Sequence, residues 1–259
     1  MTRAPEWNAA DYAANSAVQL AWARERLAAL PWRGDERVLD VGCGDGKITA
    51  EIARRVPRGS VTGIDASATM IAYAQAQFPG LEFHVMDAQQ IQFTHPFDLV
   101  FSNAALHWVD DHEAFVQGAA RVLRPGGRLV VSCGGRGNGQ AMTVALHGVM
   151  RRKRWRAWFR GMSLPYFFYR PEDYRGWLER AGFQAVRVEL TPRDAAYDGL
   201  AGLVAWLRTA WLPYTQRVPE AERWEFITAV AECYAATHPP DAAGQYWVLM
   251  VRLEMDAVK

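Results

Sequence analysis

Short apolar runs alternate with amphipathic segments over residues 36–133 of this 259-residue chain. Apolar runs of this length predict strands, and segments with a helical apolar period predict helices. The predicted strands are Val38–Val41, Val61–Ile64, Glu82–Met86, Leu99–Ser102 and Arg128–Ser132. The predicted helices are Lys47–Val56, Ala68–Gln77 and Asp111–Leu123, the last one capped by Asp110 or Asp111 and ended by Pro125–Gly127. This alternation favours an α/β fold, with a parallel sheet covered by helices on both faces.

The pattern changes after residue 134. The predicted elements there are a helical segment over Met142–Met150, a helix over Pro171–Gly182, a strand at Ala185–Leu190, a helical stretch over Gly199–Thr237 with breaks at Pro213 and Pro219, and a last strand at Tyr246–Leu253. Of the 11 tryptophans, 10 lie outside residues 36–133, so these segments either build an apolar pocket over the sheet or pack as the core of added helices. We expect one domain with three parts: an N-terminal helical lid (1–35), a ligand-binding core (36–133) and a region of remaining strands with helical cap insertions (134–259).

Composition narrows the class of protein. With 29 basic and 28 acidic residues the net charge is +1, which argues against a general nucleic-acid-binding protein. Three scattered cysteines without a CxxC pair indicate reduced thiols, and neither cysteines nor histidines have the spacing of a metal site. The N-terminus has no apolar core of a signal peptide and no apolar run of about 18 residues occurs, so we expect a cytoplasmic protein without a membrane span.

The segment VLDVGCGDG (Val38–Gly46) combines a predicted strand with a glycine-rich loop that opens a helix. Such loops bind ligands at the carboxyl ends of the strands of an open α/β sheet. The dinucleotide fingerprint GxGxxG would place its third glycine at Lys47, where this chain has none. Asp40 and Asp45 would repel a pyrophosphate, whereas they would attract a ligand that carries positive charge.

Two more acids stand at predicted strand ends. Asp65 ends the second strand and could accept hydrogen bonds from both hydroxyls of a ribose. Asp87 follows the third strand and could accept from the amino group of an adenine. Each could instead be an ordinary loop or helix-capping residue.

The segments VLDVGCGDG, VTGID, VMDAQ, FDLVFSNAALHW and VLRPGGRLV resemble, in this order and spacing, the class I S-adenosylmethionine-dependent methyltransferases. The resemblance covers about residues 36–133. It implies a Rossmann-like sheet of seven strands with the last one antiparallel, S-adenosylmethionine as methyl donor and S-adenosylhomocysteine as product. The cofactor-binding residues that it implies in this core are Asp40, Gly42, Cys43 and Gly44 at the methionine end, Asp65 and Ala66 at the ribose, Asp87 and Ala88 at the adenine, and Asn103 at the end of the fourth strand.

The methyl acceptor is indicated by a further likeness. Methyltransferases of nucleobase amines carry an Asx-Pro-Pro-aromatic turn where this chain has Asn103-Ala104-Ala105-Leu106, which argues against that substrate class. The segments FSNAALHWVDDHEAF and WNAADYAANSAVQ instead resemble small-molecule carboxylate methyltransferases, such as the trans-aconitate and juvenile hormone acid methyltransferases. This resemblance implies that Tyr12 and Asn15 close over the cofactor, and that Gln19 and Trp108 donate hydrogen bonds to the carboxylate of a small acid, which we expect to be apolar.

Several alternatives remain open at this point. His107 could be the general base for methylation of an oxygen, nitrogen or carbon atom of another metabolite, or a structural histidine. Gln19 could be a surface residue and Trp108 a packing residue. The chain could also bind S-adenosylmethionine without catalysis. The basic run Met150–Gly161 is either a solvated helix face or a docking site, for an acidic carrier protein at Arg151–Arg156 or for an anionic substrate. Interleaved arginine and tryptophan also leave RNA open, although one short run in a neutral protein argues little for it.

Overall fold

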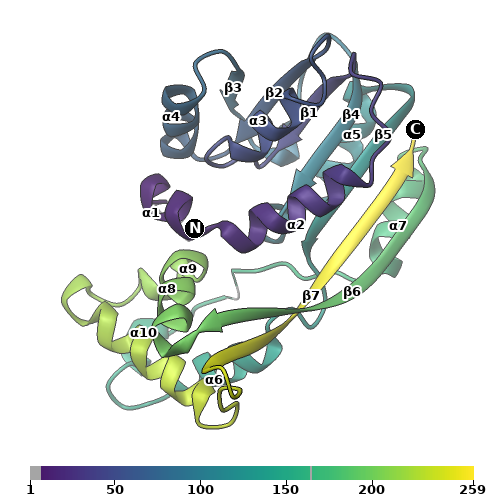
Figure 1. Ribbon diagram of the computed structural model, residues 1–259. Coiled ribbons are helices and arrows are strands. Elements are labelled where there is room, and N and C mark those ends of the chain that lie inside the picture. Colours follow the sequence, from purple (N-terminus) through teal and green to yellow (C-terminus); the bar gives the residue numbers. More distant parts are fainter. Residues whose placement is uncertain (1–6, 164) are drawn as a thin grey trace. The chain divides into compact units, whose positions relative to one another are not determined.

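The computed structural model in Figure 1 describes residues 7–163 and 165–259, without the side chain of Asn15. Internal packing divides the chain into two compact units. The core unit consists of Asn8–Arg136, Tyr166–Thr191 and Arg252–Lys259, and the helical unit contains Gly137–Pro165 and Pro192–Val251. Residues 8–35, which we expected to form a lid segment, therefore pack in the same unit as the predicted core.

The described residues form one seven-stranded sheet with the order β3-β2-β1-β4-β5-β7-β6. The strands are β1 (Arg37–Val41), β2 (Ser60–Asp65), β3 (Glu82–Val85), β4 (Phe97–Asn103), β5 (Leu123–Gly134), β6 (Gln184–Asp198) and β7 (Gln245–Val258). The pairs among β1 to β5 are parallel, and β7 runs antiparallel to β5. The predicted seven-stranded α/β fold with an antiparallel last strand is confirmed.

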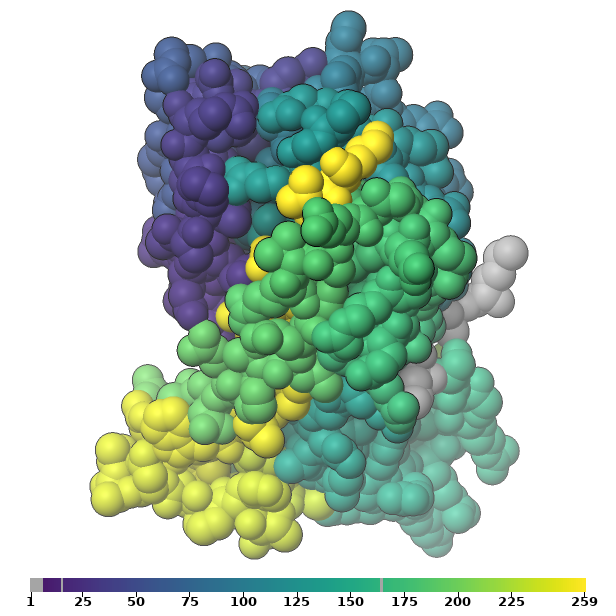
Figure 2. Space-filling model, turned by 90° about the vertical axis from the view of Figure 1, so that its right-hand side faces the viewer, coloured from purple at the N-terminus to yellow at the C-terminus, as the bar shows by residue number. Residues whose placement is uncertain are grey.

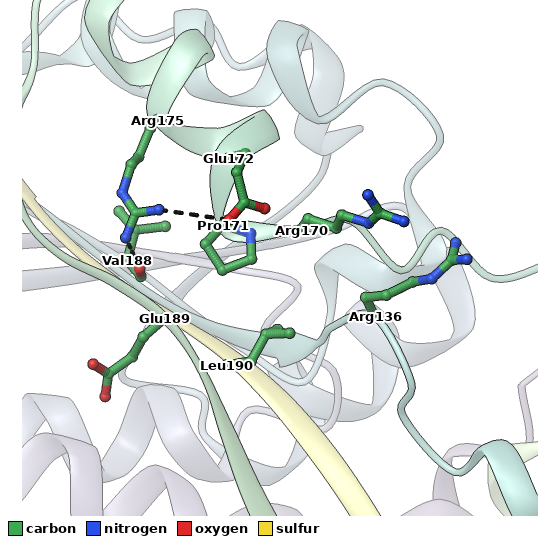
Figure 3. A pocket seen from close by; sticks show the side chains of 8 residues that line it. All are labelled: Arg136, Arg170, Pro171, Glu172, Arg175, Val188, Glu189 and Leu190. Atoms are coloured by element: carbon green, nitrogen blue, oxygen red, sulfur yellow. Dashed lines mark hydrogen bonds and ion pairs between the residues drawn. The ribbon is translucent and has the colours of Figure 1, made fainter.

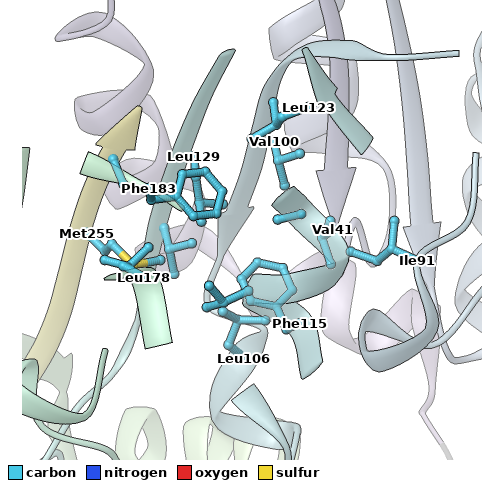
Figure 4. Close-up of a cluster of buried hydrophobic side chains, with 14 of the residues drawn as sticks. Val41, Ile91, Val100, Leu106, Phe115, Leu123, Leu129, Leu178, Phe183 and Met255 are labelled. Carbon is cyan, nitrogen blue, oxygen red and sulfur yellow. The ribbon is translucent and has the colours of Figure 1, made fainter. Parts of the chain in front are cut away.

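Alternating side chains send successive strand residues to opposite faces of the sheet, as the period of a strand requires. Val38, Leu99 and Val130 pack on one face with residues of α2 (Ala17–Ala28) and α3 (Lys47–Ala53). Their chain neighbours Leu39 and Val100 pack on the other face with residues of α5 (His112–Val122) and α7 (Pro171–Arg180), as Figure 4 shows in part. Both faces are therefore covered, which explains why these strands read as nearly continuous apolar runs.

The remaining elements of the core unit are short. They are α1 (Ala9–Asn15), α4 (Ala68–Gln77), the 3₁₀ turn η1 (Ala88–Gln90) and the 3₁₀ turn η2 (Leu106–Trp108). Side-chain caps begin α1, α4 and α5. The Asn8 side chain accepts from the Asp11 amide in α1 at 3.0 Å, the Ser67 hydroxyl from the Met70 amide in α4, and Asp111 from the Ala114 amide in α5 at 2.8 Å. Asp111 is thus the capping residue among the two aspartates that we considered.

The fifth strand differs from the prediction. We expected Pro125–Gly127 to precede it, but β5 already begins at Leu123 and contains that turn, with an irregular register against β4. The reason is the last residue of the chain, because the Gly126 amide donates to the Lys259 carbonyl at 2.8 Å and the Lys259 amide donates to the Gly127 carbonyl at 2.9 Å. Figure 2 shows the end of the chain, in yellow, on the surface beside green residues of β6 and α7.

The helical unit contains α6 (Gln140–Met150), η3 (Arg156–Phe159), α8 (Gly199–Ala210), α9 (Leu212–Thr215) and α10 (Glu220–Ala235). The breaks expected at Pro213 and Pro219 lie at the beginnings of α9 and α10. Trp155 packs edge-on against Phe226 with ring centroids 5.4 Å apart, so core packing accounts for this tryptophan. Within the described residues, no helix is both long and apolar enough to cross a membrane.

Candidate functional site

The order of the sheet places the candidate site. From β1 the chain continues to one side through β2 and β3, and it then returns to β4 on the other side of β1. Open α/β sheets bind ligands at the carboxyl ends of the strands beside such a reversal. The loop Gly42–Gly46 follows β1, and η2 follows β4, so both lie at this edge.

The loop after β1 uses its own backbone amides internally. The amides of Gly42 and Cys43 both donate to the Ile64 carbonyl, at 2.8 and 3.0 Å, and the Gly46 amide donates to the Cys43 carbonyl at 3.0 Å. The Gly44 amide donates to Asp65 Oδ2 at 3.0 Å, and the Lys47 amide donates to Asp45 Oδ1 at 3.2 Å. A phosphate-binding loop needs free amides that point at the anion. The structure therefore agrees with the sequence in arguing against a pyrophosphate ligand.

Two glycines of this loop are required for different reasons. Gly42 has a φ of +74°, and a Cβ atom there would lie 2.1 Å from the Cβ of Ala105, so the chain after β4 fills that space. Gly44 has a φ of +54°, and its missing side chain would point toward Met70 and Tyr12 at 3.4 and 4.0 Å. Cys43 between them is buried against Ile71, Ala74 and Phe83, so only its backbone faces the loop.

Three carboxyl groups converge beneath the loop. Asp40 is 2% exposed, and one of its oxygens accepts the Thr49 hydroxyl at 2.7 Å. Burial raises the pKa of Asp40 to about 7, although the hydrogen bond from Thr49 acts to lower it. The charges of Asp65 and Asp45 add to the increase. Lys47 Nζ lies 3.1 Å from Asp45. A positively charged ligand would relieve the mutual repulsion of these acids, so the residues fit a sulfonium or ammonium group.

The acids at the next two strand ends are held by backbone amides. Asp65 accepts from the Gly44 amide with one oxygen and from the Ser67 amide with the other, at 3.0 and 2.8 Å. Burial raises the pKa of Asp65, while these two hydrogen bonds act against it. Asp87 caps η1 by accepting from the Gln89 amide at 2.9 Å, and this cap is compatible with a second role at an adenine. Ala66 is exposed and Ala88 partly buried beside these acids.

Helix α1 lies against the loop. The Lys47 ammonium donates to the Ala13 carbonyl, and the Tyr12 ring approaches Gly44. Burial, followed by the charges of Asp45 and Asp65, raises the pKa of Tyr12, which keeps the phenol neutral near the carboxyl groups. The ring of Tyr12, a predicted cofactor-binding residue, therefore lies beside Gly44 of the loop. Asn15 lies in α1, but its side chain is outside the described residues.

The end of β4 brings other predicted residues together. The side-chain amide of Asn103 donates to the backbone carbonyl of Gln19 at 3.2 Å, which fixes α2 at this strand end. The side-chain oxygen of Gln19 is buried and finds no hydrogen-bond partner among the described residues. Ala104 has a φ of +57°, a conformation that costs a residue with a side chain roughly 1–2 kcal/mol. Such strain is typical of functional sites, where the surrounding structure enforces it.

His107 and Trp108 lie in η2, which begins two residues after this strained residue. The Gly134 amide of β5 donates to His107 Nδ1 at 3.3 Å, so the proton of the neutral ring is on Nε2. Burial, followed by the nearby His112, lowers the pKa of His107 to about 3. A nitrogen that already accepts a hydrogen bond, on a ring with so low a pKa, is a poor general base. The assignment of this role to His107 stays a prediction.

The sequence analysis missed an aromatic wall around η2. The Trp108 and Tyr166 ring centroids are 4.9 Å apart, and Tyr166 stacks on Phe168 at 5.5 Å. The Phe167 amide donates to the His107 carbonyl at 3.0 Å, which attaches this segment to η2. The only sequence signal was an aromatic run without the period of a helix or strand. These rings give the N–H groups of η2 an apolar surrounding.

Two hollows are lined by other residues. Figure 3 shows the first, a cavity of about 330 Å³ beside α7 and β6, lined by Arg136, Arg170, Pro171, Glu172, Arg175, Val188, Glu189 and Leu190. Its charged lining differs from the mostly apolar pocket that a small apolar acid requires. The second hollow, of about 350 Å³ in the helical unit, is lined in part by Arg151 and Arg156 of the basic run. The docking of an acidic carrier protein there stays a prediction.

Comparison with known proteins agrees with this geometry. Residues 38–127 match the model of a methyltransferase domain family. The chain is 30% identical to the trans-aconitate 2-methyltransferase of Methylobacterium nodulans over 254 residues, 96% of each protein. It is 31% identical to that of Deinococcus radiodurans over 230 residues, 85% of this chain and 87% of that protein.

A solved structure shows the same fold. It is a phosphoethanolamine N-methyltransferase 2 of Haemonchus contortus in complex with phosphomonomethylethanolamine and S-adenosylhomocysteine. The TM-score is 0.56 at 17% identity, over 94% of this chain and 53% of that one.

The sheet, the acidic glycine loop and these relatives together define a class. The chain belongs to the class I S-adenosylmethionine-dependent methyltransferases. It is an enzyme whose cofactor is S-adenosylmethionine and whose cofactor product is S-adenosylhomocysteine.

Proposed function

We propose that this methyltransferase acts on the carboxylate of a small, apolar acid and forms a methyl ester. Two relatives that are about 30% identical over most of the chain are trans-aconitate 2-methyltransferases, so their acceptor is a small acid. The observation that carries the proposal is the state of His107, whose Nδ1 accepts the Gly134 amide. Its Nε2–H is therefore a neutral donor, which suits an anionic acceptor.

The chemistry of a carboxylate fits a site without a base. A carboxylic acid with a pKa near 4 is already ionised at neutral pH, so its oxygen is a nucleophile without proton removal. The cofactor supplies a methyl group on a sulfonium, from which the group is transferred by in-line displacement. Residues of the chain then need only to orient the acceptor and exclude water.

Each residue has a separate role in this proposal. Asp65 and Asp87 would hold the nucleoside, while Asp40 and the backbone at Gly44 would hold the methionine end. Tyr12 would close over the cofactor. Gln19, His107 and Trp108 would orient the carboxylate with neutral N–H donors, which position an anion without the tight ion pair that arginine forms.

The apolar character of the acid is supported by the aromatic wall. Tyr166 and Phe168 flank His107 at centroid distances of 6.2 Å each, so the donors stand among rings. An acid with an apolar body would bury its carbon atoms against these rings while its carboxylate meets the donors. A highly charged polycarboxylate would lack basic partners on this wall.

The test is a screen of methyl transfer from radiolabelled S-adenosylmethionine to small acids. The panel contains trans-aconitate, aliphatic acids of increasing length and aromatic acids, together with phenols and amines. We expect labelled product with apolar acids, and release of the label as methanol in mild base. A base-stable product, or transfer to phenols or amines alone, would overturn the proposal.

Gln19→Ala provides a second measurement. We expect a higher KM for the acid, on the order of tenfold for one lost hydrogen bond to a charged group, with an unchanged Kd for the cofactor. Gln77→Ala, on the exposed surface of α4, is the matched control. Equal KM values in the two variants would remove Gln19 from the site.

A further inference from the structure

A chain of buried polar side chains connects β5 with η2 inside the core unit. Cys133 Sγ lies 3.9 Å from the Tyr174 hydroxyl, which hydrogen-bonds to His112 Nδ1. His112 Nε2 lies 2.6 Å from the Leu106 carbonyl, at the first residue of η2. All three side chains are at most 3% exposed. Polar groups from β5, α7 and α5 thus converge on the turn that carries His107.

The Leu106 carbonyl and the neutral ring of His112 together give the hydrogen bonds of this chain a direction. The Leu106 carbonyl can only accept, so His112 Nε2 carries the proton. Burial lowers the pKa of His112 to about 4, so the ring is neutral near pH 7 and its Nδ1 is an acceptor. The Tyr174 hydroxyl must therefore donate to Nδ1, and its oxygen is left to accept from the Cys133 thiol.

The same strand also holds η2 from the other side. Cys133 precedes Gly134, whose amide donates to His107 Nδ1 at 3.3 Å. Two consecutive residues of β5 are therefore linked to η2, one directly and one through Tyr174 and His112. Because both links end on backbone or ring atoms of the turn, they restrict its position and the tautomer of His107 together.

The surroundings of the chain are apolar, which makes its presence informative. Leu106, Phe115 and Leu178 belong to the same buried cluster as Cys133 and Tyr174. A core of this kind is stable with apolar side chains alone, and buried hydrogen bonds add directional restraint more than net stability. The polar chain therefore supplies geometry that apolar packing would not.

We propose that Tyr174 and His112 are positioning residues of this enzyme, which hold η2 so that His107 and Trp108 present N–H groups to the acceptor. The proposal rests on the proposed function for the identity of that acceptor. Neither residue touches the acceptor in this proposal; both act through the Leu106 carbonyl. Their loss should thus change acceptor binding and leave cofactor binding intact.

Tyr174→Phe tests the proposal with the loss of one oxygen atom. We expect the KM for the best acid of the panel to rise at least about fivefold, with a cofactor Kd within about twofold of the wild type. Tyr234→Phe is the matched control, because its buried hydroxyl donates to the Trp247 carbonyl at 2.6 Å in the helical unit. Equal KM values for the two variants would overturn the proposal.

Two substitutions at His112 separate positioning from packing. His112→Gln keeps a side-chain N–H that can reach the Leu106 carbonyl, whereas His112→Leu keeps only volume. We expect the leucine variant to raise KM at least fivefold and the glutamine variant to restore part of that loss. Equal effects of both variants would reduce His112 to a packing residue, even if Tyr174→Phe fails to fold.

Nitrogen NMR of the histidine rings gives a readout that needs no acceptor. In the wild type we expect His107 and His112 as neutral rings protonated on Nε2, from pH 6 to pH 8. In His112→Leu, the His107 signals should broaden or shift, because η2 loses one restraint. If no acid is methylated but these signals behave as expected, the proposed function fails and the positioning stands. Unchanged His107 signals would overturn the positioning itself.

Discussion

We expect the buried carboxyl group of Asp40 to make cofactor binding depend on pH. Its pKa of about 7 stands against an ordinary value of 3.8, which corresponds to at most about 4 kcal/mol at about 1.4 kcal/mol per pH unit. A cofactor that brings positive charge to the loop favours the ionised form and lowers this pKa. Below pH 7 the protein must therefore release a proton when the cofactor binds.

The expected effect can be calculated from this pKa. If only ionised Asp40 binds well, the Kd increases by about tenfold between pH 8 and pH 6. The cofactor-free protein has the opposite dependence. Its folded state binds more protons than the unfolded state between about pH 4 and pH 7, so its stability falls as the pH rises through this range. Asp40→Asn should remove both dependences, so its gain in stability over the cofactor-free wild type should be larger at pH 8 than at pH 5.

Isothermal titration with S-adenosylmethionine at pH 6 and pH 8, in buffers of different ionisation enthalpy, measures the affinity and the released proton together. The groups of the cofactor titrate in every variant, so the difference between wild type and Asp40→Asn isolates Asp40. Asp35→Asn removes an exposed acid and is the control. An equal Kd at both pH values, or the same pH dependence in Asp40→Asn, would refute this reasoning.

Three shorter predictions concern the loop and η2. Gly42→Ala should abolish cofactor binding, because the new Cβ would lie 2.1 Å from the Cβ of Ala105. Gly182→Ala is the control for backbone strain alone, since Gly182 has a φ of +80° and open space around the added Cβ. Equal losses of binding in the two variants would contradict the role of Ala105. Asp65→Ala should raise the cofactor Kd about 5- to 150-fold, as expected for a loss of about 1–3 kcal/mol. An unchanged Kd would show that Asp65 does not bind the ribose. His107→Ala should retain methyl transfer to acids at neutral pH, with a higher KM; a rate restored only at high pH would indicate a base.

Much of the core could be predicted because its signals are local. Neighbouring strand residues such as Val38 and Leu39 lie on opposite faces of the sheet and are both buried, so the strands are visible in the sequence as short apolar runs. Acids at strand ends, such as Asp40 and Asp65, must meet at one edge of a parallel sheet whatever the rest of the fold. The sign of the ligand charge followed from these acids, and the hydrogen-bonded loop amides agree with it.

The state of His107 could not be predicted in the same way. The sequence places it after β4 and leaves a base and a structural residue equally open. Its tautomer depends on the Gly134 amide, 27 residues away, and its lowered pKa depends on burial. Both are properties of packed surroundings.

The sequence by itself determined the class of fold, the acidic glycine loop and the strand ends that carry the cofactor residues, since short periods and turn residues encode these features. The tertiary structure alone decided which groups surround η2: the aromatic wall from Tyr166 to Phe168 and the chain from Cys133 through Tyr174 to His112. Tyr166, Phe168 and Tyr174 are separated by 40 positions or more from their partners on η2 or β5. Contacts over such separations depend on how helices and strands pack, which no local pattern records.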